Sequence, residues 1–116
     1  MKKEVIMDFR IKLCDERDGD DWFILDASYD GKKLEFSGDD FGGQVGSFFG
    51  GSEYEYWYEL DEANTEKFIA ALKEDTGIED LKEALKTRFS GITASGKIRE
   101  FAEARGIEYG FYSHVS

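Results

Sequence analysis

The chain has 116 residues, one cysteine and no proline, and 41% of its residues are hydrophobic and 16% aromatic. This size and composition predict a single α+β domain spanning residues 1–116 and exclude a disordered chain. Its 26 acidic and 15 basic residues give a net charge of −11, which argues against nucleic-acid binding and either suits a basic partner or serves solubility.

The sequence also indicates where the protein works. No apolar run approaches the length of a membrane span. Charged residues interrupt the segment after Met1, where a secretory signal needs an apolar core. The single cysteine, Cys14, has no partner for an internal disulfide. We therefore expect a cytoplasmic protein that does not contact membranes.

The first third of the chain predicts three strands. Apolar and polar residues alternate over residues 5–13, as in a half-buried strand, and a charged turn follows at residues 15–21. A second strand is expected at residues 22–29. Asp30-Gly31 is a hairpin signal, so residues 33–37 are expected to return beside it.

The most unusual stretch is residues 36–60, which contains six glycines and eight aromatic rings. It predicts a glycine-rich loop over residues 38–51, with Asp39 and Asp40 in the loop and its phenylalanines plugged into the core. Loops of this length are usually functional or disordered, and phenylalanines such as Phe48 and Phe49 argue against disorder. A fourth strand, residues 53–60, follows the loop.

After residue 60 the apolar period becomes helical. Asp61 or Asn64 caps the first helix, and Gly77 ends it. A second helix is expected at residues 79–89, a third ends at Gly106, and residues 107–112 form a last strand. The order ββββαααβ predicts an α+β fold: an antiparallel sheet of four to five strands with three C-terminal helices packed on one face.

The fourth strand offers two faces. Alternation places Tyr54, Tyr56 and Tyr58 on one face and Trp57 on the other, among glutamates. The tyrosine face is either core, where the phenols need partners, or a solvent-facing recognition strip. The candidate binding residues are Tyr54, Tyr56, Trp57, Tyr58, Asp39, Asp40, Phe48 and Phe49.

Motifs for catalysis, phosphate binding and metal binding are absent from the sequence. The acids around Gly19 lack the spacing of a calcium loop, so we expect no dedicated metal site and no cofactor. A dyad of Cys14 and His114 would require the first and last strands to be neighbours, and no third orienting group is evident. We therefore expect a protein that is not an enzyme.

From Gly38 onward, over about the last two-thirds of the chain, the sequence resembles a group of small uncharacterised bacterial proteins. The shared features are a glycine–acid–glycine loop, a Phe-Phe-Gly step, a Tyr-Glu-Tyr-Trp strand and an aromatic ending. The matching residues are Gly38-Asp39-Asp40-Phe41-Gly42, Phe48-Phe49-Gly50, Tyr54-Glu55-Tyr56-Trp57, and Gly106-Ile107 through Phe111-Tyr112. The resemblance supports the domain boundaries and implies no activity.

Two functions are consistent with these features. The first is a non-enzymatic interaction domain that masks a basic partner, as immunity proteins or antitoxins mask toxins. The second is a small-molecule or peptide site that uses the glycine-rich loop and the aromatic strand. A homodimer that pairs exposed strands is a third possibility. The orientation of Trp57 distinguishes the first two functions. If Trp57 lies on an open sheet face, a protein partner is favoured, and if it lines a cleft, a ligand is favoured.

Overall fold

The computed structural model describes residues 8–42 and 53–115. These residues form five strands and three helices in the order ββββαααβ, which confirms the predicted α+β fold. The elements are β1 (Asp8–Asp18), β2 (Asp21–Asp30), β3 (Leu34–Phe41), β4 (Glu53–Glu59), α2 (Glu62–Thr76), α3 (Leu81–Arg88), α4 (Ala94–Ala104) and β5 (Gly110–Val115).

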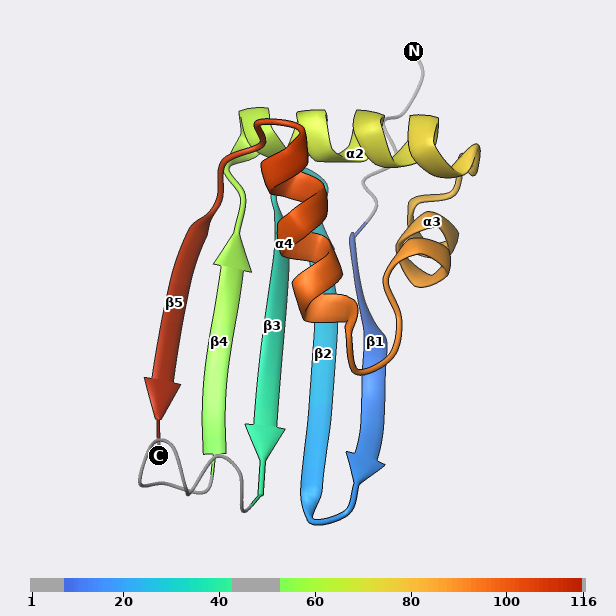
Figure 1. Cartoon of the computed structure of the whole chain (residues 1–116). Helices are drawn as coiled ribbons and strands as arrows, with labels where there is room; N and C mark the ends of the chain where they lie inside the picture. Colours follow the sequence, from blue (N-terminus) through green and yellow to red (C-terminus); the bar gives the residue numbers. More distant parts are fainter. Residues whose placement is uncertain (1–7, 43–52, 116) are drawn as a thin grey trace.

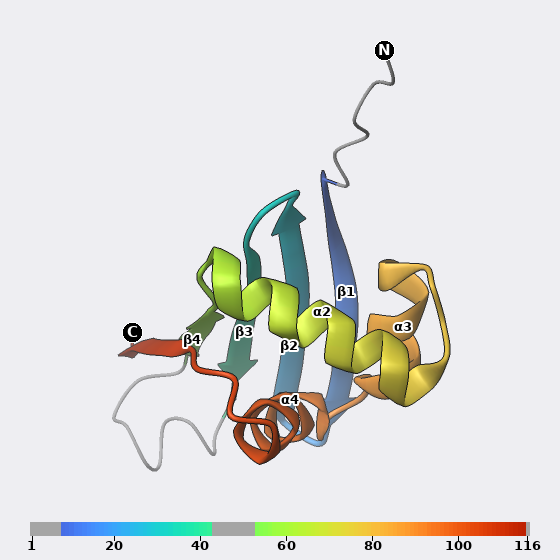
Figure 2. The same cartoon turned by 90° about the horizontal axis from the view of Figure 1, so that it is seen from above.

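The five strands form one antiparallel sheet in the order β1-β2-β3-β4-β5 (Figure 1). Strand β5 returns beside β4 after the three helices, so β1 and β5 are the two edges. The helices lie on one side of the sheet (Figures 1 and 2): α4 runs roughly along β2 and β3, α2 crosses the ends of the strands, and α3 lies beside β1. In the described part of the chain the other side carries no helix, and we call it the open face.

The core lies between the helix side of the sheet and the helices. Its centre is Phe68 of α2, whose ring centroid lies 5.6 Å from Phe36, 5.9 Å from Phe89 and 5.0 Å from Phe101. All four rings are almost fully buried. Burial of each such ring contributes about 1.5–3 kcal/mol, so this cluster is a main source of cohesion between sheet and helices.

The ends of α2 follow the predicted signals. The Asp61 side chain accepts a hydrogen bond from the Asn64 N–H, and Gly77 ends the helix with a φ of 73°. One turn into α2, the buried Thr65 hydroxyl accepts the Leu34 N–H at 3.0 Å and so ties the helix to β3. None of the helices in the described ranges is long and apolar enough to cross a membrane.

Three boundaries differ from the prediction. Strand β1 continues to Asp18, through residues expected to be a turn. There the Trp22 Nε1 donates to Asp15 at 2.7 Å, and the Arg17 guanidinium lies 4.2 Å from the Trp22 ring centroid. These cross-strand contacts hold a charged segment in the sheet although it lacks the apolar alternation of a half-buried strand.

Strand β3 extends to Phe41, so Asp39 and Asp40 are strand residues, and their expected place in a loop beginning at Gly38 is wrong. The Tyr56 ring occupies the space over Gly38 where a side chain would otherwise lie. At the other end of the chain, β5 begins at Gly110 instead of residue 107. The Ile107 N–H donates to the Ala102 carbonyl at 2.9 Å, so Ile107 completes the end of α4.

Candidate functional site

Trp57 lies on the open face. It pairs across the ladder with Ser37 of β3 and Tyr112 of β5, while its neighbours Tyr56 and Tyr58 point to the helix side and are buried. Trp57 is only partly buried. Trp57, whose orientation distinguishes a protein partner from a ligand, therefore lies on the open face of the sheet.

The two tryptophans of the open face differ in what holds them. Trp22 donates a hydrogen bond to Asp15, and its ring centroid lies 5.3 Å from that of Phe41 and 4.2 Å from the Arg17 guanidinium. Trp57 makes no hydrogen bond, ring contact or cation contact with any described residue. Trp22 thus has a structural role, whereas the half-buried Trp57 has no such partner among the described residues.

Acidic side chains flank Trp57 on both sides along the sheet. Glu35 pairs with Glu59 across β3 and β4, and Asp39 pairs with Glu55. Carboxylates placed directly opposite each other repel and destabilise a sheet. Strands β3, β4 and β5 contain no lysine or arginine that could offset this charge. We call this region the Trp57 patch: Glu35, Asp39, Glu53, Glu55, Trp57 and Glu59.

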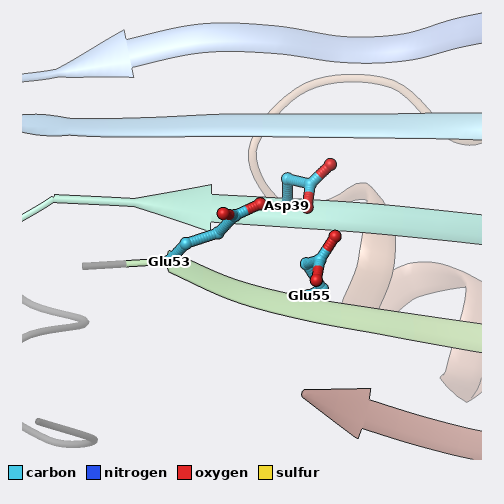
Figure 3. A group of neighbouring side chains, drawn as sticks. All are labelled: Asp39, Glu53 and Glu55. Atoms are coloured by element: carbon cyan, nitrogen blue, oxygen red, sulfur yellow. The ribbon is translucent and has the colours of Figure 1, made fainter. Parts of the chain in front are cut away.

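Three carboxylates of the patch converge at one end. Figure 3 shows Asp39 of β3 pointing toward Glu53 and Glu55 of β4, and an oxygen from each lies within 4.8 Å of the others. Burial first, then a hydrogen bond with Glu53 and repulsion from Glu53 and Glu55, raise the pKa of Asp39 to about 6. One Asp39 oxygen is buried without a hydrogen-bond partner in the described residues. Carboxylate oxygens are the ligands that hard cations prefer, so this end of the patch attracts positive charge.

On the half of the open face formed by β1 and β2, basic side chains neutralise the acidic charge. Asp26 of β2 lies 3.0 Å from the Arg10 guanidinium and 3.7 Å from the Lys12 ammonium, both on β1. Glu35, also next to Arg10, has its pKa raised by burial and by Glu59, and Arg10 only partly offsets this. Negative charge therefore predominates over β3 and β4, although the Arg10 guanidinium also reaches Ser37, the cross-strand partner of Trp57, at 3.2 Å.

A groove adjoins the Trp57 patch at the end of the sheet where β3 begins and β4 ends. Its volume is about 920 Å³, and its lining includes Glu35, Glu59 and Tyr112. Tyr112 of the edge strand β5 is 55% exposed and neighbours Trp57 across the ladder. The groove shares Glu35 and Glu59 with the patch, and its lining also includes the basic side chains of Arg10 and Lys33.

The tyrosines of β4 belong to the helix side. Tyr56 and Tyr58 are 7% and 3% exposed, and the Tyr58 hydroxyl lies 2.8 Å from the Ser95 hydroxyl of α4. Burial raises the pKa of Tyr56, and the nearby Ser95 hydroxyl offsets part of that rise. Tyr54 stacks on Tyr56 with a centroid distance of 5.7 Å. The alternative that sequence analysis left open is decided for Tyr56 and Tyr58, which are core.

A cavity of about 250 Å³ lies between these tyrosines and the first turns of α4, and we call it the α4 cavity. Asp40 lines it, because Asp40 points to the helix side and Asp39 to the open face. Burial, and then repulsion from Asp21, raise the pKa of Asp40 to about 6. The two adjacent aspartates therefore line different surfaces.

Phe48 and Phe49, the remaining candidate residues, lie outside the described residues.

Cys14 and His114 are far apart in the sheet. Cys14 lies on β1 and His114 on β5, at opposite edges. The Cys14 thiol donates to the Phe23 carbonyl at 3.4 Å, and burial and Glu16 raise its pKa. This geometry excludes the dyad considered from the sequence, and a raised pKa disfavours the nucleophilic thiolate.

Sequence reasoning missed two contributors to this surface. Alternation along β4 already placed Glu55 and Glu59 beside Trp57. Glu35 and Tyr112 join them only because β3 and β5 both pair with β4, which local patterns do not reveal.

Comparisons of the chain with protein-family models, with curated proteins and with solved structures gave no match.

Proposed function

We propose that this chain is a non-enzymatic interaction domain that binds and masks a basic protein partner through the Trp57 patch. The observation that carries the proposal is the position of Trp57, which lies between two cross-strand pairs of carboxylates and makes no hydrogen bond, ring contact or cation contact with the described residues. Tryptophan is a typical anchor residue at the centre of protein interfaces. Lysine and arginine side chains of a partner would relieve the repulsion between the carboxylates.

The charge distribution supports a basic partner in particular. The patch has no lysine or arginine on its own strands, in a chain whose net charge is −11. Unfavourable local arrangements that persist in a folded protein often mark functional surfaces. We further propose a cytoplasmic location, where the protein acts as a monomer or a homodimer.

The competing use of this region is strand pairing between two copies at β5. Phe111 and Tyr112 on that edge are 49% and 55% exposed, and β5 carries no lysine, arginine, aspartate or glutamate. An uncharged edge strand is open to pairing with another strand.

A small-molecule site, the alternative function, is supported by the α4 cavity beside Asp40.

The test is capture of the partner from the host with the tagged protein and two single variants. Trp57→Ala removes the proposed anchor, and Ile92→Ala removes an exposed apolar side chain, 42% exposed, between α3 and α4. We expect the wild type and Ile92→Ala to capture the same basic protein and Trp57→Ala to lose it. Truncation of an anchor residue typically weakens binding by about 2 kcal/mol or more.

Thermal unfolding of the same three proteins separates binding from folding. Since Trp57 is half-buried and makes none of these contacts with described residues, its truncation is expected to lower stability less than truncation of a fully buried core ring would. Capture of the same protein by Trp57→Ala, at wild-type yield, would contradict the proposed surface. Capture of only the chain itself would instead favour pairing at β5.

A further inference from the structure

The α4 cavity is a second candidate site, on the opposite side of the sheet from the Trp57 patch. Its floor is formed by the strands, and its roof by the segment that leads into α4, including Gly91, Ile92 and Ser95. Its volume of about 250 Å³ equals that of about eight water molecules. This is enough space for a small molecule and too little for a peptide segment.

Aromatic rings dominate the walls. The lining includes the rings of Phe23, Tyr54, Tyr56, Tyr58 and Phe111, which come from β2, β4 and β5. Tyr56 and Tyr58 are fixed by the core packing described above, so their ring positions are preformed. The face of an aromatic ring attracts cations, by about 0.5–2 kcal/mol per contact.

Asp40 supplies the only carboxylate among the described residues that line the cavity. It makes no hydrogen bond or ion pair with any other described residue. With a pKa of about 6, this carboxyl group is mostly ionised at neutral pH. A partly buried carboxylate without a partner is unfavourable, and a cation would relieve the cost.

Among the described residues, no basic side chain pairs with Asp40. Arg99 of α4 is the one basic residue in the described lining, and it is exposed to solvent. Burial and repulsion from Asp21 raise the pKa of Asp40, with no lowering by Arg99. The negative charge in the cavity is therefore not neutralised by Arg99.

We propose that the α4 cavity binds a small organic cation, with its ammonium group at the Asp40 carboxylate and its alkyl part among the rings of Tyr54 and Tyr56. The site is independent of the Trp57 patch, because Asp40 and Trp57 point to opposite faces of the sheet. Failure of either proposal leaves the other standing.

The test is a titration with n-butylammonium chloride, followed by amide chemical shifts in two-dimensional NMR spectra. n-Butanol has nearly the same shape without the charge, and sodium chloride at equal ionic strength controls for salt. We expect saturable shifts at the amides of Cys14 and Ser95 with butylammonium. Loss of a charge-assisted contact predicts that butanol binds about tenfold or more weakly.

The chain offers a matched pair of variants. Asp40→Asn and Asp39→Asn remove the same charge from adjacent residues, one in the cavity and one on the open face. We expect Asp39→Asn to bind butylammonium like the wild type and Asp40→Asn to bind it about tenfold or more weakly. Equal affinity in Asp40→Asn, equal affinity for butanol, or shifts that sodium chloride reproduces would each overturn the proposal. The comparison of butylammonium with butanol uses the wild-type protein, so it tests the proposal even if Asp40→Asn does not fold.

Discussion

The ring of Tyr56 covers Gly38 on the neighbouring strand and occupies the space where a β-carbon of residue 38 would lie. A glycine in a strand interior normally weakens the sheet, and an aromatic ring laid across it compensates for the missing side chain. This pair connects the floor of the α4 cavity to the core, since Tyr56 lines the cavity and is itself buried.

Gly38→Ala is expected to destabilise the fold by about 1–3 kcal/mol, because the new methyl group would displace the Tyr56 ring. Gly96→Ala is the control: Gly96 lies in α4 with nothing near its β-carbon position, and alanine there should stabilise the helix by about 0.5 kcal/mol. Chemical denaturation measures both. Equal effects of the two substitutions would show that the Tyr56 ring yields without cost.

The buried hydroxyl of Thr65 is expected to contribute more to the stability of the fold than its methyl group does. Thr65→Val keeps the shape but leaves the Leu34 N–H without its acceptor, and an unsatisfied buried donor costs about 1–3 kcal/mol. Thr65→Ser keeps the acceptor and should lose less stability. Unfolding free energies from urea titrations test this order, and a serine variant less stable than the valine variant would contradict it.

Stability is expected to fall as the pH rises from about 4 to 6. The pKa values of Asp39 and Asp40 rise from 3.8 to about 6 on folding. The folded state therefore binds more protons than the unfolded state in this window, and raising the pH removes that advantage. Near pH 7, about one unit above the folded-state pKa values, the penalty is complete and then constant.

Asp39→Asn and Asp40→Asn should each raise stability at pH 7.5 by about 1 kcal/mol, or Tm by about 4 °C, with a smaller gain at pH 4.5. Backbone N–H groups hold the pKa values of Asp30 and Asp61 below their usual range, so both stay ionised over these conditions. Glu74→Gln removes one negative charge from the exposed side of α2 and serves as the control for loss of charge. Profiles parallel to the wild type for both aspartate variants would refute the assignment.

The carboxylates of the Trp57 patch are expected to act mainly on the rate of association with the partner. The double variant Glu55→Gln, Glu59→Gln should associate several-fold more slowly at low salt, and its rate should depend less on ionic strength. Glu74→Gln with Glu100→Gln removes the same charge from exposed helix positions. Stopped-flow mixing with the captured partner measures both. Equal slowing by the two double variants would point to net charge instead of the patch.

Local patterns predicted most of the fold but only part of the site. Alternation along β4 separated Trp57 from the tyrosines, and capping residues such as Asp61 and Gly77 marked the end points of α2. The extension of β3 past Gly38 depends on the Tyr56 ring, a contact between residues on different strands. Glu35 and Tyr112 reach Trp57 only through the strand order. Local periodicity carries no information about such pairings, so they appear only in the folded structure.

The central claim is that Trp57 anchors a basic partner on the open face. Native mass spectrometry of the protein recovered from its own host tests it most directly, with the wild type, Trp57→Ala and Ile92→Ala prepared in parallel. The account predicts a stoichiometric adduct with a basic protein on the wild type and on Ile92→Ala, and a bare chain for Trp57→Ala. The same adduct on all three proteins would contradict it.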